Sequence, residues 1–403
     1  MEEAVRIVMD RTPRMPVVDV ELMKALGRTL ASDIRSDINM PPFDKSTMDG
    51  FAVISQDVST ATPGSPVTLT VVDEIQAGQV PNVPVGPGTA SRIMTGAPVP
   101  KGAEAVVMVE ETRYDEGLKQ VEILASCELG ENIARRGEDV EEGACVLSSG
   151  TRIRPVEVGI LAAVGAVSVP VYRQPTVGIA ATGNEVVEPR MTLEPGQIRN
   201  SNGYSMAAQV TCAGAVAQTV GIVRDDSKAL RETIAAGLEQ FDIFLLSGGV
   251  SAGAYDLVPG AMQACGVEIL FDRIRMKPGK PLTFGVRGDK LIFGLPGNPV
   301  SSLVGIELLV RAAIRKMQEM TPVHRSSVRA VLDEPFQQRP GRKQFVPAAA
   351  RNVDGEWRCR WVGHSGSADL FSLDRANSLF VAEADVEAIP AGAEAELILL
   401  TEW

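Results

Sequence analysis

The stretch from 241 to 300 constrains the fold of this chain more than any other. It contains two short, unbroken apolar runs, 243–246 and 291–293, and each ends in a glycine-containing turn. Such runs are typical of parallel strands that are covered on both faces, and open α/β sheets bind ligands just beyond the carboxyl ends of their strands. Glycines in these turns leave backbone N–H groups open to a ligand. The stretch therefore predicts a ligand site at the carboxyl edge of an α/β sheet.

Two further features of this stretch favour an anionic ligand. Asn298 and Pro299 are residue types preferred at the start of a helix, and a helix beginning there points free N–H groups back at the glycine turn. Lys277 and Lys280 add positive charges, held apart by a stiff Pro-Gly segment. Because the chain carries a net charge of -12, an anion needs a local basic pocket of this kind.

Strand and helix patterns alternate from residue 175 onward. Apolar strand patterns cover 177–181 and 217–223, and helix patterns cover 203–214 and 227–239. This alternation predicts a doubly wound, mostly parallel sheet with right-handed crossovers. Polar or glycine residues follow the strands and are expected at one edge of the sheet: Glu185, Asp226, Ser247, Asp256 and Gly297.

Carboxylates at strand ends suit Mg²⁺, which binds one or two of them together with phosphate oxygens. The alternative is helix capping, which Asp225 or Asp226 can perform before Ser227. The glycine turns likewise have an alternative role in tight packing. Gly-Val-Ser-Ala-Gly around Ser251 matches a hydrolase nucleophile elbow only superficially, because no clear helix follows it.

The rest of the chain indicates three further domains. Asp19 is expected to cap a helix over 19–30, and the segment 62–109 has the short strands and turns of a β domain. Another helix is expected over 155–164. We predict a helical or linker domain in two parts (1–43 and 138–173), an inserted β-rich domain (44–137), an α/β domain (174–323) and a C-terminal β-barrel-like domain (324–403).

Composition excludes several classes of function. The five cysteines are scattered without a C-x-x-C pair and there are two histidines, which argues against zinc, a disulfide framework or a histidine-rich metal site. The acidic net charge argues against general nucleic-acid or membrane-surface binding. No signal peptide or membrane-spanning run is recognisable. These features predict a cytoplasmic protein.

Six motifs occur together in a fixed order. They are Pro-Pro-Phe-Asp-Lys-Ser-Thr-Met-Asp-Gly-Phe-Ala-Val at 41–53, Arg-Ile-Met-Thr-Gly-Ala at 92–97, Thr-Gly-Asn-Glu at 182–185, Ser-Gly-Gly-Val-Ser at 247–251, Lys-Pro-Gly-Lys-Pro at 277–281 and Gly-Leu-Pro-Gly-Asn-Pro-Val at 294–300. In this combination the chain closely resembles the molybdopterin molybdenumtransferase family, often called MoeA. The resemblance covers essentially the whole chain and is looser in the last domain.

The resemblance implies a reaction and an assembly. Adenylylated molybdopterin and molybdate are the implied substrates, molybdenum cofactor and AMP the products, and Mg²⁺ the cation. The implied assembly is an elongated homodimer of four-domain subunits, with a molybdopterin adenylyltransferase as upstream partner. Two alternatives stay open: a molybdopterin adenylyltransferase, and a non-catalytic scaffold similar to the gephyrin E domain. Tungstate is an alternative to molybdate, because lysine charges discriminate poorly between similar dianions.

The resemblance also gives the candidate residues their roles. Lys277 and Lys280 are expected to hold molybdate or phosphate. The cation and the hydrolytic water fall to Glu185, Asp226 and Asp256, and Asp49, Thr95 and Asp139 are expected to complete the cleft of the second subunit. Contacts to the pterin and phosphate groups fall to Thr182, Gly183, Ser247, Gly248, Gly249, Ser251, Pro296, Gly297, Asn298 and Ser367.

Four positions depart from the usual family pattern. Asn184 stands where an aspartate is more common, and Ala254 where an acidic residue is common. Pro347 replaces a frequent arginine, which leaves Arg342 and Lys343 as the nearby cations. Ala368 or Asp369 falls where a second histidine is frequent. These departures affect the details of metal and oxyanion binding.

Overall fold

The structure is a computed structural model, and it describes residues 1–249, 257–363 and 366–400. The chain divides into two compact units. The first comprises Met1–Ser32, Gly150–Arg154 and Ser168–Trp403, and the second comprises Asp33–Ser149 and Pro155–Val167. The glycine turns and both candidate lysines belong to the first unit.

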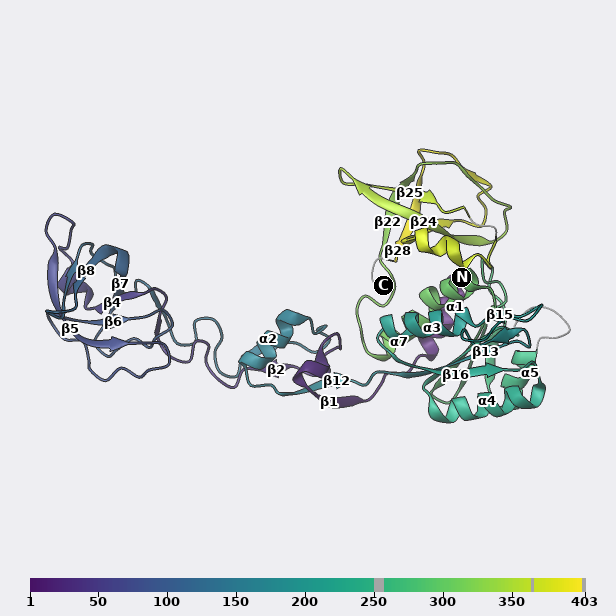
Figure 1. The fold of residues 1–403 in the computed structure, drawn as a ribbon, viewed down its shortest axis with the longest axis horizontal. Coiled ribbons are helices and arrows are strands. Elements are labelled where there is room, and N and C mark those ends of the chain that lie inside the picture. Colours follow the sequence, from purple (N-terminus) through teal and green to yellow (C-terminus); the bar gives the residue numbers. More distant parts are fainter. Residues whose placement is uncertain (250–256, 364–365, 401–403) are drawn as a thin grey trace. The chain divides into compact units, whose positions relative to one another are not determined.

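A six-stranded sheet lies in the first unit, with the order β16-β13-β17-β21-β20-β18 (Figure 1). The four neighbouring strands β16, β13, β17 and β21 are parallel to one another. Strand β20 runs antiparallel to both its neighbours, β21 and β18. The sheet is therefore mostly parallel. Its strands are β13 (Thr176–Thr182), β16 (Val216–Val223), β17 (Ile243–Ser247), β18 (Glu268–Phe271), β20 (Thr283–Arg287) and β21 (Lys290–Leu295).

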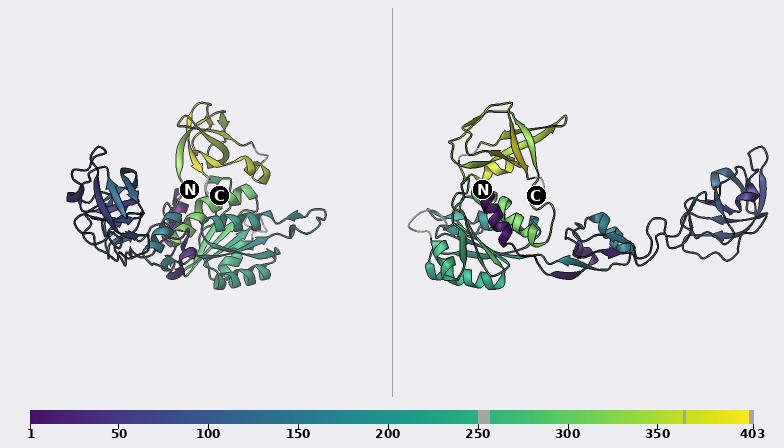
Figure 2. Two further views of the ribbon diagram at one scale, coloured as in Figure 1. Left: turned by 60° about the vertical axis from the view of Figure 1, so that its left-hand side comes forward. Right: turned by 180° about the vertical axis from the view of Figure 1, so that it is seen from behind.

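Helices cover both faces of this sheet, as Figures 1 and 2 show. One face packs against α1 (Glu2–Arg11), α3 (Ser201–Cys212) and the run of α6 (Pro299–Gly305), the π-helix η4 (Ile306–Val310) and α7 (Arg311–Met317). The other face packs against α4 (Ser227–Gln240) and α5 (Leu257–Ala264). Burial on both faces explains why the strands read as unbroken apolar runs.

The C-terminal part of the first unit is a small β domain. Its sheet has the order β19-β24-β25-β22-β28-β26, and an added β24–β26 pairing closes five of the strands on themselves. The strands are β19 (Met276–Lys277), β22 (Ser327–Leu332), β24 (Lys343–Val353), β25 (Glu356–Trp361), β26 (Ser378–Ala382) and β28 (Glu394–Leu399). Because β19 comes from the α/β segment, it carries Lys277 into this second sheet.

The second unit is rich in β structure. Its main sheet has the order β7-β4-β6-β5-β9-β8, and two adjoining apolar cores contain Phe51 and Ile93. The sheet strands are β4 (Gly50–Val53), β5 (Val67–Ile75), β6 (Thr89–Ile93), β7 (Ala105–Met108), β8 (Thr112–Asp115) and β9 (Gln120–Ile123). Shorter elements are β2 (Ile34–Arg35), β3 (Lys45–Ser46), β10 (Ile133–Ala134), β11 (Cys145–Leu147) and α2 (Pro155–Ala163).

The helix expected over 19–30 is wrong. Residues Val17–Glu21 form strand β1, which pairs antiparallel with β12 (Ser168–Tyr172), and Asp19 lies opposite Pro170. A short 3-10 turn, η1 (Leu22–Ala25), follows. The alternation of valines with acidic residues in Val-Val-Asp-Val-Glu matches a strand better than a helix. The real first helix is α1, and its Ala4 and Val8 are buried in the core of the α/β domain.

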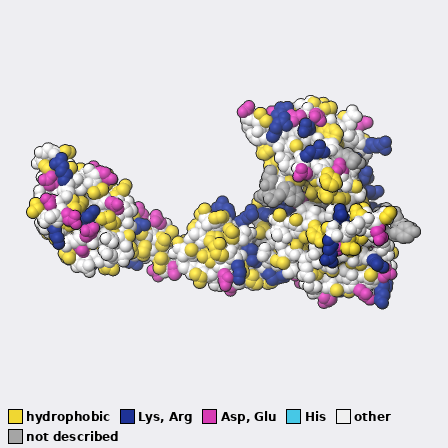
Figure 3. Space-filling model, in the orientation of Figure 1, with side chains coloured by type: hydrophobic (Ala, Val, Ile, Leu, Met, Phe, Trp, Pro, Cys, Tyr) yellow, Lys and Arg dark blue, Asp and Glu magenta, His cyan; other side chains and the backbone are white. Residues whose placement is uncertain are grey.

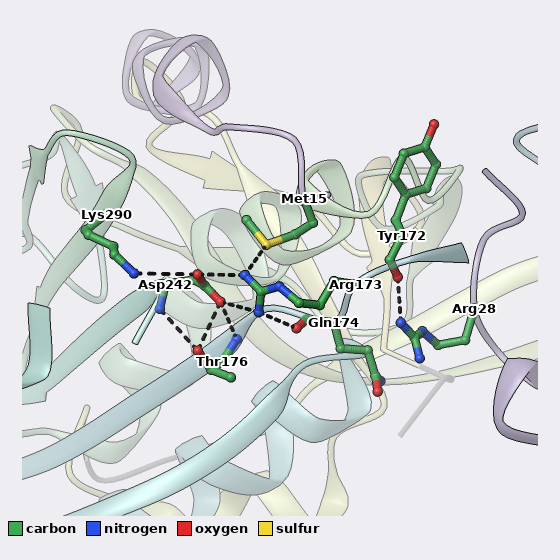
Figure 4. A network of polar contacts seen from close by, with 8 residues as sticks. All are labelled: Met15, Arg28, Tyr172, Arg173, Gln174, Thr176, Asp242 and Lys290. Carbon is green, nitrogen blue, oxygen red and sulfur yellow. Dashed lines mark hydrogen bonds and ion pairs between the residues drawn. The ribbon is translucent and has the colours of Figure 1, made fainter. Parts of the chain in front are cut away.

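A polar network fixes the start of β17, at the opposite end from the glycine turns (Figure 4). Asp242 accepts hydrogen bonds from both terminal nitrogens of Arg173 at 2.9 Å and from the backbone N–H of Thr176 at 2.8 Å. Burial raises the pKa of Asp242, but these hydrogen bonds outweigh it and the pKa lies below its usual value. The network ties the linker after β12 to the α/β sheet.

Charge is mixed on the face of the molecule that Figure 3 draws. On the face drawn in Figure 3, acidic and basic side chains are interspersed. Among the described helices, none has the length and apolar character required to cross a bilayer. Because the surface charge on this face is mixed and the protein is acidic, a region in which basic side chains gather differs in electrostatic potential from its surroundings.

Candidate functional site

The parallel strands β13, β16, β17 and β21 end at one edge of the sheet, where two glycine turns lie against each other. Thr182 Oγ1 donates to the carbonyl of Ser247 at 3.3 Å, joining the ends of β13 and β17. Gly248 has φ +101, and a Cβ there would lie 2.8 Å from the carbonyl oxygen of Thr182. Only glycine fits so close an approach. The expectation that the Gly248 N–H is open is wrong, because it donates to the carbonyl of Leu295 at 2.9 Å.

Asn202, on the first turn of α3, joins the two glycine turns. Its Nδ2 donates to Ser247 Oγ at 2.9 Å and to the carbonyl of Gly297 at 2.8 Å. The side chain is almost completely buried. We did not predict this residue, since only its position two residues after Asn200, the N-cap of α3, distinguishes it in the sequence. Asn202 sets the spacing of the turns after β17 and β21.

The acidic candidates at this edge have separate surroundings. The Glu185 carboxylate folds back over Gly183, just before β14 (Val186–Val187), which pairs with β15 (Ile198–Arg199). Asp226 caps α4 by accepting from the backbone N–H groups of Lys228 and Ala229. Asn184, one of the departures, accepts from the N–H of Asp225 at 3.3 Å. Among the described residues, no three acidic, histidine or cysteine side chains are grouped to hold a metal.

Both candidate lysines line one cavity of about 790 Å³. It lies where the loop after β19 and the turn after β21 meet the C-terminal β domain. The sequence-predicted residues Pro296, Asn298 and Ser367 also line it. The structure thus brings five of the candidates together in a single cavity. Thr182, Gly183, Glu185 and Asp226 are not among its lining residues.

The cavity is strongly basic. Lys277, Lys280 and Arg342 line it, and no carboxylate does so among the described residues. All three cations are exposed, and no ion pair joins them to an acidic group in the described part of the chain. In a protein of net charge -12, unpaired cations facing one cavity create the local positive potential that an anion requires.

The start of α6 differs from the predicted anion site. Asn298 occupies the N-cap position but makes no side-chain capping bond. Instead its Nδ2 donates to Ser367 Oγ at 2.8 Å, and the Val300 N–H donates to the Ser367 carbonyl at 3.1 Å. The C-terminal domain therefore takes up an N–H group that was expected to face the ligand. Within the described lining, this leaves the side chains of Lys277, Lys280 and Arg342 as the groups whose charge suits an anion.

In the second unit, Asp49 and Thr95 are in contact. Asp49 Oδ1 accepts hydrogen bonds from both Thr95 Oγ1 and Thr95 N at 2.7 Å, and these bonds lower the pKa of the exposed Asp49 carboxyl. Asp139 is exposed and its backbone N–H donates to the carbonyl of Met40. The segment 41–53 is thus an ordered part of the β-rich unit with a fixed carboxylate.

Two candidates, Ser251 and Asp256, lie outside the described residues. The departure at Ala254 lies there too. Gly249, the last described residue before them, has φ +66.

Comparisons with known proteins identify relatives along the whole chain. Residues 1–165 match the family model of the MoeA N-terminal region (domain I and II), residues 178–316 match a probable molybdopterin binding domain, and residues 329–400 match the MoeA C-terminal region (domain IV). The chain is 36% identical to the molybdopterin molybdenumtransferase of Bacillus subtilis, over 100% of this chain and 94% of the relative. It is also 36% identical to molybdopterin molybdenumtransferase 2 of Mycobacterium tuberculosis, over 100% and 99% of the two chains.

The fold has a matching solved structure. The molybdopterin biosynthesis moea protein from Pyrococcus horikosii superimposes with a TM-score of 0.84 and 31% identity, covering 100% of this chain and 99% of that one. The similarity therefore extends over all the domains.

Proposed function

The chain belongs to the MoeA family of molybdopterin molybdenumtransferases, and we propose that it inserts molybdate into adenylylated molybdopterin. The reaction releases AMP and forms molybdenum cofactor. The observation that carries this proposal is the basic cavity, in which Lys277, Lys280 and Arg342 face a common space without a carboxylate among the described residues. Such a cavity attracts a tetrahedral dianion and the phosphates of a nucleotide.

Different residues bind the anion and the pterin nucleotide in this proposal. Lys277 and Lys280 hold the oxyanion by charge, and Asn298 and Ser367 offer hydrogen bonds from neighbouring walls of the cavity. The turns at Ser247 and Gly297, spaced by Asn202, bind the pterin nucleotide at the strand ends. Ser247 Oγ already accepts from Asn202, so its own hydrogen is available for a ligand oxygen.

Mg²⁺ and the homodimer are also part of the proposal. Glu185 and Asp226 are carboxylates at neighbouring strand ends, but Asp226 is engaged in capping α4. The described residues alone do not form a complete Mg²⁺ site. A homodimer with shared clefts gives a role to Asp49, Thr95 and Asp139, which lie outside the α/β domain.

One assay distinguishes the proposed function from its two alternatives, an adenylyltransferase and a non-catalytic scaffold. Adenylylated molybdopterin is incubated with the protein, with and without molybdate, and AMP is measured. A molybdenumtransferase releases AMP and yields active cofactor only when molybdate is present. An adenylyltransferase forms adenylylated molybdopterin from ATP, and a scaffold does neither. Absence of molybdate-dependent AMP release from folded protein would contradict the proposed function.

A further inference from the structure

The basic cavity is larger than an oxyanion requires. Its volume of about 790 Å³ falls in the range of pockets that bury whole organic ligands. A tetrahedral oxyanion beside Lys277 and Lys280 fills only a small part of this space. The remainder extends over residues of the C-terminal β domain, including Gln344 and Trp361.

Among the residues that line the remaining space, Gln344 most clearly indicates a contact with a ligand. It is 5% exposed, yet no hydrogen bond to its side-chain amide is found within the described residues, and the residue lines the cavity. Gln344 on β24 is the register partner of Lys277 on β19. Paired residues of neighbouring strands project to the same face of a sheet, so the amide lies beside the lysine. The amide atoms of Gln344 are not among the fully enclosed polar atoms that lack a partner, so the amide opens to the cavity and is available to pair with a ligand.

Aromatic and apolar residues form the adjoining wall. Trp361 is half-buried at the end of β25, and Phe336 packs edge-on against it with ring centroids 6.1 Å apart. Both belong to or border the core of the C-terminal domain, and both line the cavity. A tryptophan backed by a second ring and by the core is a rigid surface for stacking a planar ligand.

We propose that this end of the cavity binds the heteroaromatic ring of a phosphorylated ligand. The ring stacks on Trp361, its edge pairs with the Gln344 amide, which both donates and accepts, and its phosphate faces Lys277. The assignment of the lysine end of the cavity to an anionic group rests on the proposed function. The new element is a subsite for a ring on the C-terminal domain. Adenylate and pterin phosphates share the required chemistry.

Binding to the full-length protein tests the subsite without any substitution. Isothermal titration calorimetry compares AMP and a pterin phosphate monoester with ribose 5-phosphate and inorganic phosphate. Stacking and edge pairing predict that at least one ring-bearing phosphate binds about tenfold more tightly than ribose 5-phosphate. Equal affinities for all four ligands would overturn the proposal and leave the anion site intact. Failure of phosphate and molybdate to bind at all would contradict the anion site of the proposed function as well.

Substitutions of Trp361 and Gln344 test whether these two residues bind the ring. Trp361→Leu removes the ring, while Trp361→Phe keeps one and breaks no hydrogen bond, because Trp361 Nε1 has no partner within the described structure. We expect Trp361→Leu and Gln344→Leu each to bring the affinity for the ring-bearing ligand close to that for ribose 5-phosphate, and Trp361→Phe to retain most of it. Phosphate affinity stays unchanged in all three. Unaltered affinity in both leucine variants would refute the assignment.

Fluorescence provides a readout that does not depend on these substitutions. The chain has three tryptophans, Trp357, Trp361 and Trp403, so a Trp357→Phe, Trp403→Phe protein reports on Trp361 alone. A stacked ring quenches its emission at saturation, whereas ribose 5-phosphate does not. Equal emission with both ligands would contradict stacking on Trp361.

Discussion

Asn202 contacts both glycine turns, because its amide nitrogen donates hydrogen bonds to Ser247 Oγ and to the Gly297 carbonyl. Within the described structure, no other side chain hydrogen-bonds to both of these residues. Each hydrogen bond contributes about 1 kcal/mol. The residue is therefore a positioning group for the proposed nucleotide site.

We expect Asn202→Ala to raise KM for adenylylated molybdopterin about tenfold or more, because the two glycine turns lose the side chain that sets their spacing. Gln209→Ala is the matched control. Gln209 is a buried amide on the same helix, but among the described residues it donates only to the Ser205 carbonyl within α3. Both variants lose stability, and only Asn202→Ala changes KM. If steady-state kinetics gave the same KM for the two variants, the positioning role would be wrong.

Asp242 makes a different contribution, to stability. Its folded-state pKa lies below the usual value of 3.8, so the ionised form stabilises the fold at neutral pH. That stability is lost as pH falls through the depressed folded pKa. We expect Asp242→Asn to lower the stability of the α/β domain by about 2 kcal/mol at pH 7, measured by calorimetry.

The pH dependence of this difference checks its cause. The gap between wild type and Asp242→Asn is expected to shrink below pH 3.8. Asp272→Asn serves as control, because Asp272 is half-exposed and, in the described part of the chain, pairs only with its neighbour Arg273. A change below about 0.5 kcal/mol is expected. A difference for Asp242→Asn that stayed constant with pH would point to packing instead of charge.

Sequence patterns predicted individual site residues unevenly. Lys277 and Lys280 were recognisable from their Pro-Gly spacing, and the structure brings them into one cavity. Gln344, Trp361 and Asn202 were not predicted, because their roles arise from contacts with residues remote in the chain. Asn298 was predicted as a cap from its residue type, but a hydrogen bond to Ser367 replaced the local one.

At the scale of elements, the turn after β17 depends on glycine. Gly248→Ala puts a Cβ 2.7 Å from Thr182 Oγ1 and 2.8 Å from the Thr182 carbonyl oxygen. We expect this variant to fold with a displaced turn and to bind adenylylated molybdopterin at least about tenfold more weakly. Calorimetry or kinetics provides the measurement.

Gly288→Ala is the control for backbone strain. Gly288 has φ +59, and a Cβ added there would have no atom within 4 Å, so alanine incurs only the left-handed cost of about 1 kcal/mol. Both variants are destabilised, but ligand affinity falls only for Gly248→Ala. Normal affinity in Gly248→Ala would show that the turn tolerates displacement.

The elements of the α/β domain were largely predictable, since burial on both sheet faces produces unbroken apolar runs such as that of β17. The helix over 19–30 failed for a physical reason. Strand β1 is stabilised by pairing with β12, which lies far along the chain, and local periodicity does not reveal such a partner. No strand was predicted over 283–287, where β20 lies, and its antiparallel direction follows from pairing with β18 and β21.

At the scale of the whole molecule, the candidate residues fall in two compact units. Asp49 lies in the second unit, and Lys280 lies in the first. If clefts are shared between subunits of a homodimer, an Asp49→Ala chain paired with a Lys280→Gln chain has one intact cleft. We expect isolated heterodimers to recover about half of the wild-type activity. Heterodimers as inactive as either parent would exclude shared clefts.

The most direct measurement is the titration of the full-length protein with molybdate by isothermal calorimetry. Lys277→Gln and Lys280→Gln are each expected to weaken binding at least about tenfold, and raised ionic strength should weaken wild-type binding through screening. Lys228→Gln, on the exposed surface of α4, removes the same charge away from the cavity lining and should bind as wild type does. Unchanged molybdate affinity in both cavity variants would contradict the assignment of this basic cavity as the oxyanion site.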